Sequence, residues 1–137
     1  MSGSALLTLQ GAVKSALEAD TALMALVSAV HEAVPASPDY PFVLLGEKSE
    51  SALDTFSAGG AASAILLDIR SQAGDDQELL QIYDRVKAAL HGRDLTLSGY
   101  TLVSGRASLV KTVLDADGLT RRAEARYEAV TQEATAL

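Results

Sequence analysis

The chain has no cysteine and no tryptophan, and its 137 residues include only two phenylalanines and four tyrosines. The absence of cysteine excludes disulfides, thiol catalysis and cysteine-ligated metals. The scarcity of aromatic side chains means that any core must be aliphatic and rich in alanine. With 137 residues, of which 48% are apolar, the chain has the length and the apolar content to form one domain, residues 1–137, around such a core.

Long apolar runs and clustered basic residues are also missing. No run approaches the length of about 20 residues that spans a bilayer. The first four residues lack the basic charge of a secretory signal, so we expect a soluble protein made in a cytoplasm. The formal net charge of −7 disfavours sequence-independent binding to nucleic acid, which depends on Lys and Arg. An acidic surface does suit a wall past which DNA slides without sticking.

Residues 100–130 predict a long antiparallel hairpin. Asp117-Gly118 lies between two β-prone runs, and this dipeptide favours the mirror-image turn in which both central residues have positive φ. Ser104-Gly105 predicts a bulge in the first arm. The opposed pairs that this turn predicts are Lys111 with Glu124, Thr112 with Ala123, Val110 with Ala125, and Ser108 with Tyr127.

The second arm of this hairpin alternates with period two. One face is small and apolar, and consists of Ala123, Ala125, Tyr127 and Ala129. The other face carries charges of both signs, and consists of Arg122, Glu124, Arg126 and Glu128. This pattern predicts a sheet that is covered on one side only. The row of alanines allows a helix to pack close to the covered side.

The remaining elements complete an α+β domain, in which an antiparallel or mixed β-sheet has its helices packed mainly on one face. We expect helices at residues 4–19 and 21–28, the second capped by Asp20, and a third that starts with a capping box of Asp75 and Glu78 and stops at Gly92. We expect strands at residues 30–34, 41–47 and 62–71. Residues 49–60 are predicted to form a long loop, and residues 1–4 and 133–137 to be frayed.

Candidate chemical groups are few. His31 and His91 lack a second histidine or a carboxylate at metal-ligand spacing, so a structural role is favoured for both. Asp75, Asp76 and Glu78 are acids at a helix start, where capping explains them better than a divalent cation. The residues therefore predict no catalytic site, no metal and no cofactor.

The alternating charges have two interpretations. Arg122, Glu124, Arg126 and Glu128, with Lys111 opposite, form either a solvated face with cross-strand ion pairs or a surface that sets one subunit against a copy of itself. Leu53 and Phe56, in the predicted loop, either tuck it onto its own core or reach a neighbouring ring.

Several segments in order resemble one family. They are the N-terminal Ala-Leu-Leu-Thr-Leu-Gln-Gly-Ala-Val-Lys run, Tyr-Pro-Phe-Val followed by Gly-Glu at residues 40–47, Asp-Ile-Arg-Ser at 68–71, the helix ending in His91-Gly92, and the Asp-Ala-Asp-Gly hairpin with its Arg/Glu-rich last strand. From about residue 5 to 129 the chain resembles the tail-completion, or tail-terminator, proteins of long-tailed bacteriophages and phage-like gene transfer agents.

This resemblance implies a structural virion protein in the tail-neck region, assembled in the bacterial host cytoplasm. The protein is expected to form a ring, usually a hexamer, that ends tube growth and joins the tail to the head. The implied partners are further copies of the chain, the tail tube protein and the head-side connector or stopper, with DNA only passing through the lumen. An edge strand with mixed charges fits pairing with a neighbouring subunit. The alternatives are a non-enzymatic adaptor or regulatory module, another phage neck protein, or an enzyme with a converging polar site.

Overall fold

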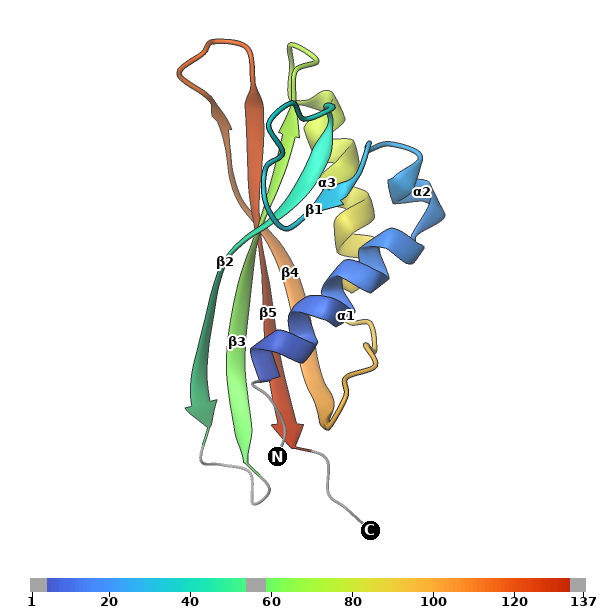
Figure 1. The fold of residues 1–137 in the computed structure, drawn as a ribbon, viewed down its shortest axis with the longest axis vertical. Coiled ribbons are helices and arrows are strands. Elements are labelled where there is room, and N and C mark those ends of the chain that lie inside the picture. The colour runs from blue at the N-terminus through green and yellow to red at the C-terminus, as the bar shows by residue number, and fades with distance from the viewer. Residues whose placement is uncertain (1–4, 54–58, 134–137) are drawn as a thin grey trace.

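The computed structural model describes residues 5–53 and 59–133. Figure 1 shows one twisted sheet with every helix on the same side of it. In chain order the elements are α1 (Ala5–Ala19), α2 (Thr21–Met24), β1 (Val30–His31), β2 (Phe42–Leu53), β3 (Gly60–Ser71), α3 (Gln77–Leu90), β4 (Tyr100–Leu114) and β5 (Arg121–Glu133).

The sheet has the strand order β1-β2-β3-β5-β4. Short β1 runs parallel to β2, and all other neighbours are antiparallel. The predicted class, an α+β domain with a mixed sheet, a C-terminal hairpin and helices on one face, is therefore confirmed. Within the described residues, no helix combines the length and apolar character needed to cross a membrane.

The two central strands, β3 and β5, alternate strictly between the core and the bare face. The side chains of Ile65, Leu67 and Ile69 on β3 are fully or almost fully buried. The alanines that the sequence places on one face of β5 are equally buried, which confirms that face. Each fully buried Leu or Ile contributes roughly 1.5–3 kcal/mol, so this shared face holds most of the folding free energy of the sheet.

Both long helices pack on that face. Helix α1 lies over β2 and β3, and α3 lies over β3, β5 and β4. Their buried residues recur every three or four positions, as an amphipathic helix requires, and they are Leu9, Val13 and Leu17 on α1 and Leu79, Ile82, Val86 and Leu90 on α3. Asp20 caps α2 as expected, because its Oδ1 accepts a hydrogen bond of 2.8 Å from the Leu23 N–H.

The hairpin register is correct near the turn and wrong farther away. Lys111 pairs with Glu124 and Thr112 with Ala123, as predicted, but Tyr127 lies opposite Ala107 instead of Ser108, and Ala125 opposite Leu109 instead of Val110. The reason is a register shift between Leu109 and Lys111, which moves every later pair by one residue. A second shift between Leu102 and Ser104 confirms the bulge expected near Ser104-Gly105.

The turn itself is not the mirror-image type. Gly118 has a φ of +71°, while no described residue other than glycine has a positive φ, so Asp117 does not take the predicted conformation. Instead, Asp117 Oδ1 accepts hydrogen bonds from the N–H groups of Leu119 (2.9 Å) and Thr120 (2.8 Å). These bonds lower the pKa of Asp117. The carboxylate therefore holds a six-residue connection between the strands.

Several predicted boundaries were also wrong. Residues 49–53 continue β2 and Gly60 begins β3, so six of the twelve residues of the predicted loop at 49–60 are strand. Residues 54–58, which include Phe56, lie outside the described residues. Helix α2 ends at Met24 and β1 at His31, earlier than expected. Glu133 ends β5 in register with Tyr100, so it is not frayed. The error at residues 49–53 has a physical cause, because alternating small and polar residues on an open sheet edge read as a loop.

One contact inside the sheet constrains the sequence tightly. Tyr127 is fully buried on β5, and its hydroxyl has no hydrogen-bond partner within the described residues. Gly105, on β4, lies directly against that hydroxyl, and a Cβ added to Gly105 would sit 2.9 Å from Tyr127 Cζ and closer still to the hydroxyl oxygen. Glycine at this position therefore makes room for the ring.

Replacing Gly105 with alanine is expected to destabilise the fold by about 3 kcal/mol, since the new methyl overlaps a fully buried ring that cannot move aside. The midpoint of chemical denaturation measures the loss. Adding Tyr127→Phe to Gly105→Ala should recover part of it, because the worst overlap is with the hydroxyl. A Gly105→Ala protein as stable as the wild type would contradict this packing.

Tyr127→Phe alone should leave stability equal or raise it by about 1 kcal/mol, because it removes a buried hydroxyl without a partner. Burial also raises the pKa of Tyr127 to about 12 from an ordinary value near 10. The folded protein thus keeps the hydroxyl proton of Tyr127 after the unfolded chain has lost it. The contribution of protonated Tyr127 to the free energy of unfolding is therefore complete below pH 10 and is lost as the pH rises toward 12. Denaturation midpoints between pH 9 and 12 should fall less steeply in Tyr127→Phe, and parallel curves would refute the assignment.

Candidate functional site

The two histidines have structural contacts. His91 follows α3, and its Nδ1 accepts a hydrogen bond of 3.1 Å from the backbone N–H of Ala107 on β4. His31, on β1, packs edge-on against Phe42 with ring centroids 5.5 Å apart. Both contacts agree with the structural roles that the sequence favoured.

The acids at the start of α3 also have structural roles, but not the predicted capping box. The N-cap is Asp76, which makes no capping hydrogen bond, and Glu78 accepts a hydrogen bond from the Ser71 hydroxyl (2.6 Å). Asp75 Oδ1 accepts from the Gln77 N–H at 3.1 Å, and Asp76 forms an ion pair with Arg121 at 3.3 Å. The three carboxylates thus bond to different partners and do not converge on one point. No group of three metal-ligating side chains occurs among residues 5–53 and 59–133.

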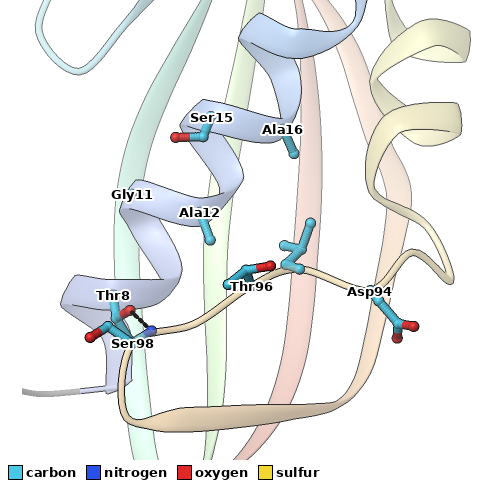
Figure 2. Close-up of a pocket in the computed structure, with 9 residues that line it drawn as sticks. Thr8, Gly11, Ala12, Ser15, Ala16, Asp94, Thr96 and Ser98 are labelled. Atoms are coloured by element: carbon cyan, nitrogen blue, oxygen red, sulfur yellow. Dashed lines mark hydrogen bonds between the residues drawn. The ribbon is translucent and has the colours of Figure 1, made fainter.

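An open groove of about 920 Å³ lies between α1 and the segment before β4. Figure 2 shows that its walls are short side chains, with Thr8 Oγ1 accepting a hydrogen bond of 3.0 Å from the Ser98 N–H. Asp94 is the only titratable residue among the described residues that line it. The remaining described residues that line the groove are hydroxyl-bearing or apolar.

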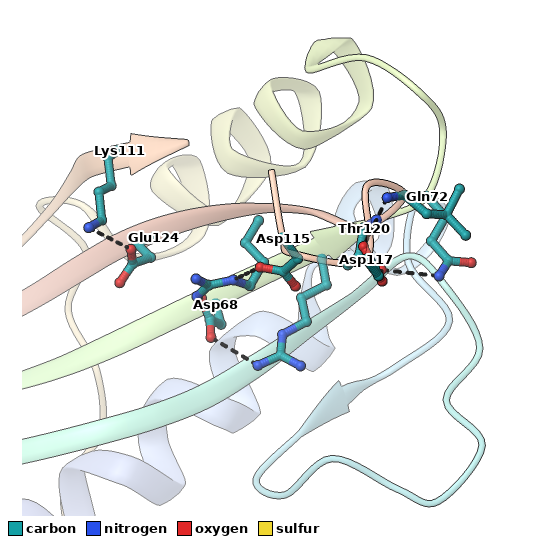
Figure 3. A network of polar contacts seen from close by, with 10 residues as sticks. Asp68, Gln72, Lys111, Asp115, Asp117, Thr120 and Glu124 are labelled. Atoms are coloured by element: carbon teal, nitrogen blue, oxygen red, sulfur yellow. Dashed lines mark hydrogen bonds and ion pairs between the residues drawn. The ribbon is translucent and has the colours of Figure 1, made fainter. Parts of the chain in front are cut away.

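The bare face of the sheet carries a connected set of ion pairs near the hairpin turn (Figure 3). Arg122 bridges two carboxylates, Asp115 at 2.6 Å and Asp68 at 3.4 Å. Asp68 also contacts Arg70 at 3.3 Å. The hydrogen bond from Arg122 to Asp115, together with the nearby Asp68, raises the pKa of Arg122. These bonds tie the β4–β5 connection to β3.

The charged residues proposed from the sequence as a subunit contact therefore fall into two groups. Arg122 is bound within its own chain, and Lys111 pairs with Glu124 at 3.4 Å. Arg126 and Glu128 are about half exposed and touch only weakly, at 3.6 Å. Their strand, β5, lies between β3 and β4, so the mixed-charge strand is not the sheet edge that we expected, and it can meet a partner only through its side chains.

The true edge on that side is β4, and the chain covers much of it. Gly92 donates its N–H to the Gly105 carbonyl at 3.0 Å, beside the bond from Ala107 to His91. The Tyr83 hydroxyl on α3 accepts from the Leu109 N–H. Tyr83 of α3 and the two residues after the helix thus satisfy outward backbone groups of β4 over residues 105–109. Sequence reasoning missed this cover, although a histidine and a glycine after an amphipathic helix were its signal.

Comparison with known proteins identifies the family. Residues 11–132 match the family model of the tail completion protein gp17. Tail completion protein gp17 of Bacillus phage SPP1 is 32% identical over 114 residues, which cover 82% of this chain and 84% of that protein. The chain belongs to the tail completion protein gp17 family.

Solved structures agree with this tail-completion fold. A chain in the virion of a native gene transfer agent particle superposes with a TM-score of 0.86 at 28% identity, covering 96% of this chain and 99% of that one. The structure of bacteriophage SPP1 gp17 gives a TM-score of 0.66 at 27% identity, covering 91% and 89%. The resemblance stated from the sequence is therefore confirmed.

The two arginines of β5 allow a matched test of the ion pairs. Arg122→Ala should destabilise this tail-completion domain by about 1–2 kcal/mol, because it removes the cation of the partly buried Asp115 and leaves Asp68 with Arg70 alone. Arg126→Ala, on the same strand and face, should change stability by less than about 0.5 kcal/mol. Urea denaturation measures both, and equal effects would show that the Arg122 bridge does not hold the hairpin.

Proposed function

We propose that this protein is a structural component of the tail of a long-tailed phage or gene transfer agent particle. In this role it forms a ring, most simply a hexamer, at the head-proximal end of the tail tube. The ring ends tube growth and presents a surface to the head-side connector. It is assembled in the bacterial host cytoplasm and remains in the tail-neck region of the virion.

The observation that carries this proposal is the match to a chain of the gene transfer agent virion over almost the full length of both chains. A similarity of this extent leaves no large insertion in which a separate activity would reside. The match to SPP1 gp17, itself a tail completion protein, supports the same role in phages. The histidines and the acids at the start of α3 support this role, since each makes a structural contact within the fold.

The charge of the chain suits a ring that DNA crosses. With a formal net charge of −7, the protein repels phosphates at long range, and a passing duplex would find few cations to hold it. DNA is therefore a transient passenger of the lumen and not a ligand. The tail tube protein and the head-side connector are the expected lasting partners, in addition to further copies of the chain.

Two sets of residues remain candidates for those contacts. Arg126 and Glu128 offer both signs of charge on the bare face, while Lys111, Glu124 and Arg122 support them from within the chain. Leu53 is half-buried at the end of β2, at the opposite end of the sheet from the β4–β5 turn (Figure 1). We propose that Leu53 meets an adjacent ring. Phe56, the other candidate for that contact, lies outside the described residues.

Particles made without the protein test this role. When its gene is deleted in the host that produces the particles, electron microscopy should show heads without tails together with tails of abnormal length, because nothing ends the tube or joins it to the head. Supplying the wild-type chain from a plasmid should restore joined particles. Intact head–tail particles with tails of normal length in the deletion would overturn the proposal.

A non-enzymatic adaptor or regulatory module is the other candidate, since the described residues also suit a monomer that binds one partner. Light scattering after size-exclusion chromatography and mass spectrometry of purified particles separate the two. A ring component associates with itself or with tubes and is present in the particle. An adaptor stays monomeric and is absent from it.

A further inference from the structure

We propose that the free half of β2 in one copy pairs, antiparallel, with the end of β4 in the next copy, so that their sheets join head to tail around the ring. The two segments are named here the β2 edge (residues 46–53) and the β4 tip (residues 110–114). The inference rests on the proposed ring and names the contact that closes it.

The β2 edge is an open strand edge. Strand β1 pairs only with Val43 and Leu44, so among the described residues the rest of β2 has β3 as its single neighbour. The N–H of Val43 points away from β3, toward Ala29. Backbone groups of alternate residues point to the same side of a strand, and the bulge after Leu45 shifts this alternation by one residue. The backbone groups of Lys48, Glu50 and Ala52 therefore also point away from β3. These three residues present unpaired donors and acceptors, which is how an edge strand recruits another strand.

The β4 tip is the part of the other edge that α3 leaves open. The backbone groups of Gly105, Ala107 and Leu109 face outward and bond to the end of α3. The bulge at residue 110 shifts the alternation, so Thr112 and Leu114 face outward next. No strand in the described residues pairs with them on that side. The cover over residues 105–109 thus leaves the last five residues of this edge open to strand pairing.

Strand directions favour this pairing. Along the sheet β2, β3, β5 and β4 alternate in direction, so β4 runs opposite to β2. The β2 edge and the β4 tip lie at opposite ends of the sheet, since the registers place Lys48 level with Ala107 and Val43 level with Thr112. Two copies in the same orientation, one displaced along the strand direction, therefore bring the two segments together antiparallel. The two contacting surfaces differ, so each copy offers one of each, and repetition generates a ring when the rotation closes.

Side chains beside the two segments are complementary. Leu114 of the β4 tip is 50% exposed and Leu80 of α3 40% exposed, and both lie on the helix-covered side of the sheet. Beside the β2 edge on the same side is Leu7, 67% exposed, next to Leu6, whose N–H donates to Glu50. Joining the sheets would bury these apolar groups against one another.

Charge adds to the match. The β4 tip carries one cation, Lys111, which already contacts Glu124 at 3.4 Å, and no acid, while the β2 edge carries Glu47 and Glu50 with only Lys48 against them. Opposite charges on the two segments favour the heterologous pairing over β2 with β2 or β4 with β4. The partner that pairs with the β2 edge is therefore the β4 tip of the next copy of the chain.

Introduced cysteines test the contact cleanly, because the chain has none of its own. Ser51 and Val113 both point to the bare face of the sheet, opposite Ala62 and Arg122 respectively. A Ser51→Cys/Val113→Cys chain, oxidised as the assembled ring, should give a ladder of cross-linked species up to the size of the ring on a non-reducing gel. Ser49→Cys in place of Ser51→Cys covers the register two residues away.

The single variants are the controls. Ser51→Cys alone and Val113→Cys alone should give no ladder, since each copy then offers one half of the bond. Dimers from Ser51→Cys alone would indicate that β2 pairs with β2, and would overturn the proposal. A ring that assembles from the double variants without cross-links would overturn it as well.

A proline variant tests the backbone bonds. Ala52→Pro removes an outward N–H from the β2 edge without breaking the ladder to β3, a position where an edge strand tolerates proline. Self-association, measured by light scattering, should weaken about tenfold, the effect of one or two lost hydrogen bonds. Ala52→Thr keeps the N–H and should associate like the wild type, and far-ultraviolet circular dichroism confirms that both variants are folded.

These outcomes separate the contact from the function. If folded Ala52→Pro forms rings and complete particles as well as Ala52→Thr does, this contact is wrong while the role in the tail stands. If the wild-type chain neither associates with itself nor enters particles, the proposed function and this inference fail together.

Discussion

The burial of one face of β3 and β5 is the constraint on which the rest of the molecule depends. Every second side chain of these strands enters a core shared with α1 and α3, and the side chains between them are left on a face that no described helix covers. Polar groups on that face remain near water, so they are tolerated without burial costs. The alternation therefore decides both where the fold gains its stability and where it can present charge.

The small side chains under α3 have a second consequence. Alanines on β5 let the helix approach the sheet closely, and the end of α3 then reaches the edge of β4. There His91, Gly92 and Tyr83 bond to backbone groups that would otherwise be open to any extended chain. Covering an edge with a helix is one way in which proteins avoid uncontrolled strand pairing. The same packing that stabilises the core thus limits where another copy can join.

Much of this fold could be predicted from the sequence, because its long elements have strong periods. The alternation of β5, the stripe of α3 and the Asp20 cap are local patterns, and each appears in the structure as expected. The bulge at residue 110 has no such signal, since Val110 reads as an ordinary strand residue, and it displaced half of the predicted register. The far half of β2 was taken for a loop because its serines and alanine pack against little. Strand order was also beyond local reasoning, as β5 became central only through pairing with β3, 60 residues earlier in the chain.

The distribution of charge bears on how such a protein can associate. On the bare face most ion pairs are closed within one chain, around Arg122 and between Lys111 and Glu124, so they hold the strands in place and leave little charge for a partner. Exposed ion pairs are weak and are screened by salt, whereas backbone hydrogen bonds and buried leucines are far less sensitive to it. An assembly that joins sheets edge to edge would therefore keep its geometry as ionic conditions change. A fold whose charged side chains form ion pairs within one chain, and whose short strand edges stay open, is suited to specific, repeated contact with copies of itself.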